Sequence, residues 1–186
     1  SSATKITFSG TSATVSGNGA SAKNGIVTIT AAGTYVFSGT VSEGQIVVNS
    51  TAKGTVRIIL NNANISNSTT APVNVLEADK VLITIADGTT NSITDKARTS
   101  TTEEEYTAAI YSKADTVVNG SGKLTVNAGY KDGITSKDDL IIISGEITVN
   151  STDDGIIGKD LLNIYNGNIT VISGGDGIKS TYDTDT

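Results

Sequence analysis

Hydrophobic residues occur along this chain in short runs rather than in long amphipathic stripes. Val, Ile and Leu make up most of each run, and Gly, Asn, Asp or Ser stand on either side. β-branched residues between such turn formers are typical of strands. No segment keeps an apolar i, i+3, i+4, i+7 stripe over ten residues, so we expect an all-β protein without helices. Representative runs are residues 27–29, 46–48, 58–60, 81–85, 140–143 and 161–164.

The C-terminal half carries a repeat of 22 residues. The tripeptide Asp-Gly-Ile begins at Asp132, Asp154 and Asp176, so both spacings are 22 residues. The flanking segments 145–149 and 167–171 also match each other. A constant period of this length is typical of a solenoid, in which each turn of chain stacks on the next. We therefore predict a parallel solenoid of strands with about 22 residues per turn.

The repeat also suggests how the chain is organised. Residues 1–186 are enough for a single solenoid domain of roughly eight turns. We expect residues 1–44 to form an N-terminal cap with irregular turns and residues 45–107 to form less regular turns. A polar surface loop is expected at 95–106, and regular repeats at 108–186. With two Phe and no Trp, the core should be aliphatic. The last turn has no capping motif, so we expect more chain or another chain to cover it.

Composition excludes several kinds of chemistry. The chain has no His and no Cys, which rules out imidazole or thiolate nucleophile systems and ordinary zinc sites. A net charge of −6 disfavours nucleic acid as a partner. No run reaches the roughly 18–20 apolar residues of a membrane span. The surface is expected to be rich in Ser, Thr, Asn and Gly, and the chain does not begin with Met, so we expect a secreted or cell-surface protein whose leader has been removed.

Stacking should arrange aspartates of successive turns in columns. Neighbouring strands lie about 4.8 Å apart, and two carboxylates at that separation repel by about 3 kcal/mol at an effective dielectric near 20. Ca²⁺ takes six to eight oxygen ligands at about 2.3–2.6 Å, so it could bridge such a pair. Asp115 is expected to stack on Asp139. The predicted calcium ligands are Asp132, Asp153, Asp154, Asp176, Asp138, Asp139 and Asp160.

Two other interpretations of these aspartates stay open. Asp-Gly is a favoured turn pair, because Gly accepts positive φ and Asp can bond to its own backbone, so solvated turn aspartates need no ion. Alternatively Lys131, Lys137 and Lys159 could pair with the columns and leave no metal at all.

Several motifs resemble a known bacterial family of secreted, calcium-containing, right-handed parallel β-helix proteins from clostridia and their relatives. The motifs are ITFSG (6–10), AIYSK (109–113), YKDGITSKDDL (130–140), DDGI (153–156) and GGDGIKS (174–180). Members are described as carbohydrate-binding, with affinity for cellulose and acidic plant polysaccharides, and as structurally similar to pectate lyases. The resemblance implies a right-handed parallel β-helix, bound calcium and a polysaccharide partner.

The leading hypothesis is non-catalytic, calcium-dependent binding of plant cell-wall polysaccharide, either acidic pectin-like polyuronate or cellulose or both. An acidic protein should repel polyuronate, so bridging calcium or a strip of lysines is needed. Lys113, Lys137 and Lys159 occupy equivalent positions of successive turns. These three, with Lys131 and Tyr130, are the predicted substrate-binding residues.

A pectate-lyase-type enzyme is the alternative. Calcium would acidify the proton α to a uronate carboxylate and a lysine would remove it. Lys137, Lys159 and Lys179 are the candidate bases, but neighbouring Asp should raise a lysine pKa, which disfavours that role. Arg57 and Arg98 lie outside the regular repeats, so no arginine is expected beside the acidic columns.

Weaker candidates for surface recognition come from the same stacking. Thr125, Thr148 and Thr170 should align as in an adhesive or ice-binding solenoid, but no Thr-x-Thr recurs on every turn. Further tyrosines that could stack on sugar rings are Tyr111, Tyr165 and Tyr182.

Overall fold

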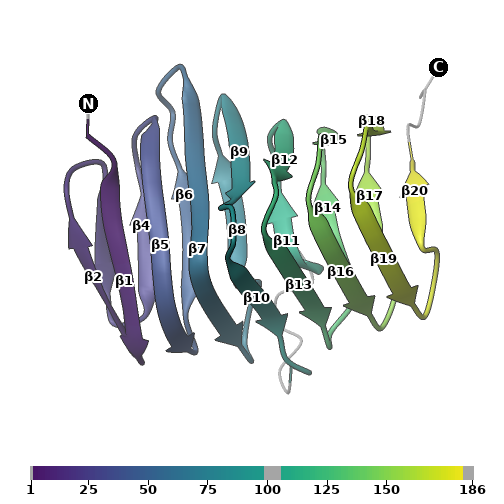
Figure 1. Cartoon of the computed structure of the whole chain (residues 1–186), viewed down its shortest axis with the longest axis horizontal. Helices are drawn as coiled ribbons and strands as arrows, with labels where there is room; N and C mark the ends of the chain where they lie inside the picture. The colour runs from purple at the N-terminus through teal and green to yellow at the C-terminus, as the bar shows by residue number, and fades with distance from the viewer. Residues whose placement is uncertain (1, 99–105, 182–186) are drawn as a thin grey trace.

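The computed structural model describes residues 2–98 and 106–181. All regular structure in these two ranges is β-strand, as the hydrophobic pattern predicts. Figure 1 shows the strands side by side along the long axis of the molecule, from the N-terminus to the C-terminus. The described ranges contain no helix long and apolar enough to cross a membrane.

The strands form two sheets, which we call sheet A, with twelve strands, and sheet B, with eight. Sheet A contains β1 (Thr4–Gly10), β2 (Ser12–Ser16), β5 (Gly33–Ser42), β7 (Thr55–Asn67), β9 (Lys80–Ile85), β10 (Thr90–Asp95), β12 (Thr116–Gly120), β13 (Lys123–Ala128), β15 (Asp139–Ile142), β16 (Glu146–Ser151), β18 (Leu161–Ile164) and β19 (Asn168–Ser173). Sheet B contains β3 (Ala20–Lys23), β4 (Ile26–Ile29), β6 (Gln45–Asn49), β8 (Val73–Glu77), β11 (Ala108–Ser112), β14 (Asp132–Ser136), β17 (Ile156–Gly158) and β20 (Ile178–Ser180).

Sheet A curls and divides at the long strand β7. The first half of β7 pairs with β9 and its second half pairs with β10, with Asn62 at φ 58° between the two halves. From there one leaf continues through β12, β15 and β18, and the other through β13, β16 and β19. Together with sheet B, the two leaves surround the core, so each later turn contributes three strands.

Nearly all strand pairs are parallel and join equivalent positions of successive turns. The pairing of β14, β17 and β20 places Ile134, Ile156 and Ile178 beside one another. These partners are 22 residues apart, which is the repeat seen in the sequence. The step before them is longer, since Ile110 pairs with Ile134. Equivalent side chains therefore stand in columns about 4.8 Å apart along the stack.

The N-terminal cap is smaller than the sequence predicts. β5 pairs in parallel with β1 and β7, and β4 pairs in parallel with β6, so the parallel stack extends well into residues 1–44. Only β2 and β3 are antiparallel, against β1 and β4. These two strands cover the first edge of each sheet, which protects it from further pairing.

Aliphatic side chains fill most of the core, but the prediction of a core without large aromatic residues is wrong near the N-terminus. The Phe8 and Phe37 rings stack there, with centroids 5.7 Å apart. Tyr35 is 2% exposed, and its hydroxyl donates to the Ala31 carbonyl at 2.7 Å. The first turns thus use aromatic volume where later turns use Ile, Val and Leu.

The polar segment predicted as a surface loop at 95–106 begins in the interior. Asp95 ends β10, and its Oδ2 lies 2.6 Å from Nη2 of Arg98, with both side chains at most 1% exposed. Arg98 also donates to the Tyr106 carbonyl at 2.8 Å, and its guanidinium lies 4.2 Å from the centre of the Tyr130 ring. Residues 99–105 of this segment lie outside the described residues. The arginine that was expected to lie away from the acidic columns thus contacts the turn that leads into the first Asp-Gly-Ile.

The opposite end of the stack has no antiparallel strand over it among the described residues. β18, β19 and β20 are the last strands of their sheets. Apolar side chains stay exposed there, with Tyr165 at 71%, Ile172 at 64% and Ile178 at 49%.

Candidate functional site

Five of the seven predicted calcium ligands gather, with Asp115, in two groups at the turns that flank sheet B. Within each group the carboxylate oxygens lie within 4.8 Å of one another. We call Asp132, Asp153 and Asp154 the buried acidic cluster. We call Asp115, Asp138 and Asp139 the open acidic cluster.

The buried acidic cluster is built by the Asp-Gly-Ile repeat. Asp132 and Asp154 stand two residues before the paired Ile134 and Ile156, so they face each other from neighbouring turns. A Cβ at Gly133 would overlap the Val149 side chain and the carbonyl of the next turn. None of the three glycines of this repeat has a positive φ, so they do not form the left-handed turn that the sequence suggested. Gly133 and Gly155 instead allow close approach between turns, while Gly177 has room for a side chain.

A backbone ladder uses part of each carboxylate. The N–H of Asp154 donates to Asp132 Oδ1 at 3.2 Å, and the N–H of Asp176 donates to Asp154 Oδ1 at 2.8 Å. This is a structural role for the aspartates, but the bonds join neighbouring turns of the stack, whereas the turn interpretation expected each Asp to bond to its own backbone. It leaves the second oxygen of each carboxylate for another partner, so a turn role and a cation role are compatible.

Among these carboxylates, Asp132 has the least favourable environment for a negative charge. It is 8% exposed, and no basic side chain among the described residues forms an ion pair with it. Burial, and then the carboxylates of Asp154 and Asp153, raise its pKa, against hydrogen bonds from the Asp154 N–H and the Thr107 side chain. Carboxylate oxygens are the ligands that Ca²⁺ prefers, so this donor set fits the ion that the resemblance implies.

Asp176 lies in the same column but outside the cluster. Its Oδ2 is 3.5 Å from the Nζ of Lys179, which also forms an ion pair with Asp154. Burial raises the pKa of Asp154, but the Lys179 ammonium and the Asp176 N–H outweigh it, so the pKa lies below its usual value. The hydrogen bond to Asp154 raises the pKa of Lys179, as expected for a lysine beside aspartates. Lysine pairing therefore holds at this step of the column, through Lys179 rather than the three lysines proposed for it.

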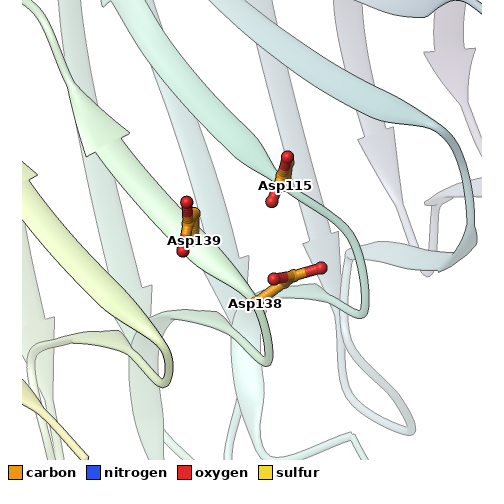
Figure 2. Close-up of side chains that lie close together, drawn as sticks. All are labelled: Asp115, Asp138 and Asp139. Atoms are coloured by element: carbon orange, nitrogen blue, oxygen red, sulfur yellow. The ribbon is translucent and has the colours of Figure 1, made fainter. Parts of the chain in front are cut away.

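The open acidic cluster joins two neighbouring turns (Figure 2). Pairing of β12 with β15 sets Asp115 beside Asp139, as the repeat predicts, and Asp138 completes the group. All three are partly exposed. Burial, and then the carboxylates of Asp115 and Asp160, raise the pKa of Asp138. Asp160 is exposed and lies outside the group, and Lys80 Nζ approaches Asp115 Oδ2 at 3.9 Å.

Lysines form a column at the end of the sheet B strands that faces away from the buried acidic cluster, next to the open acidic cluster. Lys113, Lys137 and Lys159 directly follow β11, β14 and β17. The N–H of Lys137 donates to the Ser112 carbonyl at 2.8 Å, and that of Lys159 to the Ser136 carbonyl at 3.0 Å. The three lysines thus stand at equivalent positions of successive turns. We call them the lysine column.

Two members of the lysine column do not pair with the aspartates in the way that the sequence suggested. Lys137 and Lys159 form no ion pair with Asp138, Asp160 or any other carboxylate in the described residues. Burial, and then the Lys159 ammonium, lower the pKa of Lys137, while Asp132 opposes them. The expectation of a raised pKa is therefore wrong for this lysine, since burial and the neighbouring Lys159 outweigh the effect of Asp132.

Sequence reasoning missed a buried polar row next to this column. Tyr111 is 2% exposed and pairs with Asn74 on one side and Thr135 on the other. Asn74 Oδ1 and Thr135 Oγ1 are buried without a hydrogen-bond partner, which is unusual because such an atom costs about 1–3 kcal/mol. Lys137 Nζ lies 5.6 Å from the centre of the Tyr111 ring. The polar residues that flank Tyr111 in the sheet, Asn74 and Thr135, are the sequence feature that could have indicated this row.

The predicted sugar-stacking tyrosines differ widely in access. Tyr111 is too buried to stack on a sugar. Tyr130 is half-buried, with Arg98 over its ring and Lys131 Nζ 5.4 Å from the ring centre. Tyr165 is exposed, and Tyr182 lies outside the described residues.

Fold and site together define a parallel-stranded all-β protein with carboxylate clusters suited to a hard cation and a column of lysines on the same sheet. A family model described as "Carbohydrate-binding domain-containing protein" matches residues 23–186, and the chain belongs to this family.

One relative and one solved structure sharpen this assignment. The chain is 39% identical over 128 residues to a carbohydrate-binding domain-containing protein of Acetivibrio thermocellus, an alignment that covers 67% of this chain and 45% of that protein. The chain thus spans less than half the length of this curated relative. The fold is similar to a polysaccharide lyase-like protein from C. thermocellum, solved as a gadolinium derivative, with TM-score 0.80 and 27% identity over 95% of this chain and 94% of that one.

Proposed function

We propose that this protein binds plant cell-wall polysaccharide without cleaving it, with acidic, pectin-like polyuronate as the main ligand and cellulose as a second. The observation that carries the proposal is the opposition of charges across one sheet. Asp132 begins β14 and Lys137 directly follows it, so the buried acidic cluster and the lysine column stand at opposite ends of the same strands, while the open acidic cluster lies at the lysine end. Membership of a carbohydrate-binding family supports a sugar polymer as the partner.

Calcium is part of the proposal. The buried acidic cluster would hold one ion and the open acidic cluster a second. Bound calcium supplies a bridge between protein carboxylates and the carboxylate of a uronate. The solved neighbour was obtained as a gadolinium derivative, and gadolinium, like calcium, is a hard cation that prefers oxygen ligands.

The lysines would supply the remaining attraction. A protein with net charge −6 repels an acidic polymer at long range, but charges beyond about 8 Å are screened at physiological ionic strength. Local lysines without a carboxylate partner can therefore outweigh the net charge at the contact. Lys137 and Lys159 meet this description among the described residues.

Two further properties belong to this proposal. The turns are taken to be right-handed with about 22 residues each, as crossovers between parallel strands are right-handed in about 98% of cases. The protein is taken to act outside the cell, because its proposed ligands are cell-wall polymers.

Affinity electrophoresis tests the proposal directly. The protein should be retarded in gels that contain polygalacturonate and calcium, and retardation should be lost in EDTA. The solution should show no ultraviolet absorbance from unsaturated uronide. Pull-down with microcrystalline cellulose tests the second ligand. Free migration in polygalacturonate with and without calcium would contradict the proposal.

A calcium-dependent lyase is the second candidate, because one lysine has the properties of a base. Burial and the neighbouring Lys159 lower the pKa of Lys137, which makes its neutral amine more available than that of an ordinary lysine. In this role Lys137 would take the proton α to the carboxylate of a bound uronate. Release of unsaturated uronide by the wild-type protein, abolished in Lys137→Gln, would establish the lyase and overturn the non-catalytic proposal.

A further inference from the structure

The lysine column runs along the axis of the stack, across the strands. Its members are joined turn to turn by backbone hydrogen bonds, Lys137 to Ser112 and Lys159 to Ser136. The spacing between them is therefore set by the separation of neighbouring strands, about 4.8 Å, and not by flexible loops. The sheet therefore fixes the direction of the column and the spacing of its backbone positions, from which the lysine side chains extend.

A linear polyuronate carries one carboxylate per sugar, and the length of one sugar unit is comparable to the separation of neighbouring strands. A polymer that lies along the axis can therefore present successive carboxylates to successive lysines. A polymer that lies along the strands meets a single lysine at this end of the sheet and reaches the buried acidic cluster at the other end. The two orientations thus engage different numbers of lysines.

The central lysine is placed for such a ligand. Lys137 is half-buried, has no carboxylate partner in the described residues and is crowded by the ammonium groups of Lys159 and Lys113. Like charges gathered in this way repel, and a row of anionic groups would relieve the repulsion.

A second feature points to a ligand at the same place. The Nζ of Lys137 lies over the Tyr111 ring, and Thr135 pairs with Tyr111 in the sheet. Thr135 Oγ1 is buried without a hydrogen-bond partner, and so is Asn74 Oδ1 on the other side of Tyr111. Buried polar atoms of this kind are rare in folded proteins, and here both belong to residues in register with Tyr111, whose ring the Lys137 ammonium approaches.

We propose that Lys113, Lys137 and Lys159 bind three consecutive unesterified uronates of a chain that runs along the axis of the stack. This inference rests on the proposed function and adds a selectivity to it. A methyl ester removes the charge of a uronate, so the column selects runs of at least three free carboxylates rather than a high overall charge.

Pectins of equal esterification but different pattern provide the first test. Isothermal titration calorimetry in calcium should give tighter binding to a block-wise esterified pectin than to a randomly esterified one. For oligogalacturonides, affinity should rise with each unit up to the trimer. Equal affinity for the two pectins would overturn the inference while leaving the proposed function intact. Binding to neither pectin nor polygalacturonate would overturn the proposed function itself.

Matched variants provide the second test. Lys113→Gln and Lys159→Gln should each weaken trimer binding about two- to fivefold, the range expected for an exposed charge pair. Lys123→Gln is the control, because Lys123 is an exposed lysine of sheet A paired with Glu146 at 3.0 Å, and it should bind like the wild type. If Lys137→Gln weakens binding while Lys113→Gln and Lys159→Gln behave like Lys123→Gln, the polymer lies along the strands and the inference is wrong. Thermal melts should confirm that these variants fold.

Discussion

The two acidic clusters are built from the same residue type by the same stacking, yet they differ in what surrounds them. In the buried acidic cluster Asp132 is 8% exposed and accepts a backbone hydrogen bond from the next turn. All three carboxylates of the open acidic cluster are partly exposed to water. In the buried cluster Asp153 is exposed and Asp154 partly exposed, so water screens their charges as it does in the open cluster, whereas the repulsion that acts on the buried Asp132 persists.

Nearby lysines increase the difference. Lys179 pairs with Asp154 at the edge of the buried cluster, whereas Lys80 reaches Asp115 of the open cluster only at 3.9 Å. One column of aspartates can thus act as a backbone ladder, a cation site or an ion pair, depending on burial and on which lysine reaches it. We expect the buried cluster to bind calcium more tightly, because a bound cation would relieve a stronger repulsion between its carboxylates.

The largest expected effect comes from the ion pair that lies beside the buried cluster and not the open one. Arg98→Met leaves the Asp95 carboxylate buried without its partner and removes the contact with Tyr130. Loss of one member of a buried pair costs about 3–5 kcal/mol. Urea denaturation should show this loss.

Arg57→Met is the matched control for this experiment. Arg57 is exposed on β7, so its substitution should change the free energy of unfolding by no more than about 0.5 kcal/mol. Equal stability of the two variants would mean that the Arg98 pair does not anchor this side of the molecule.

The second largest effect should be stabilisation by calcium, which we expect to differ between the two clusters. Calcium at 100 times its dissociation constant should stabilise the native state by about 2.7 kcal/mol for one site. Asp132→Asn should lose most of the tighter site, and Asp138→Asn the weaker one. In EDTA, Asp132→Asn should be more stable than the wild type, because the amide keeps an acceptor for the Asp154 N–H and removes a repelled charge.

Melting curves of both variants and the wild type, with calcium and with EDTA, check this prediction. Absence of any calcium shift in the wild type would leave the backbone ladder as the sole role of these aspartates. Destabilisation by Asp132→Asn in EDTA would show that its charge helps the apo protein.

The repeat predicts the columns well because register follows directly from a constant period. Asp132, Asp154 and Asp176 stack as expected, and so do the lysines of the column. The repeat does not predict which side chains surround each aspartate of the column. Asp176 meets Lys179, which has no counterpart in the preceding turns, where Thr135 and Ile157 occupy the equivalent positions.

The sequence did not identify residues whose environment depends on contacts between non-equivalent positions of the repeat. Arg98 belongs to no repeat, and its partners Asp95 and Tyr130 come from different turns. Tyr111 looks like a surface aromatic in sequence, but it packs with Ala71, Ala108 and Tyr106 and is buried. Periodicity carries information about equivalent positions only, and these contacts join positions that are not equivalent.

The pH dependence of stability should differ with and without calcium. In EDTA the raised pKa of Asp132 means that the native state holds more protons than the unfolded state just above pH 3.8, so stability falls as pH rises through that window. Asp138 acts in the same direction. Asp154, whose pKa is lowered, opposes them: its contribution is present above pH 3.8 and is lost as pH falls through the lowered value.

With calcium the trend should reverse, because protons and calcium compete for the same carboxylates and the ion is lost on acidification. Thermal melts across this pH range in EDTA and in calcium check both signs. In Asp132→Asn the EDTA trend should weaken more than in Asp138→Asn, whose carboxylate is the more exposed of the two. Parallel pH profiles in the two buffers would contradict the assignment of these groups to a cation site.

The smallest expected effect comes from Lys179, the lysine that pairs with the last two aspartates of the Asp132, Asp154 and Asp176 column. Lys179→Gln removes an ammonium that pairs with the partly buried Asp154 and lies near the exposed Asp176, and a pair near the surface contributes about 1 kcal/mol or less. Stability should therefore change little, while calcium binding at the buried cluster should tighten by up to about fivefold, because Asp154 no longer has a competing cation. Lys80→Gln is the matched change beside the open cluster, and at 3.9 Å from Asp115 it should alter calcium binding less. Calorimetric titration with calcium measures both. If Lys179→Gln weakens calcium binding, the ammonium orients Asp154 for the ion instead of competing with it, and the two clusters differ by burial alone.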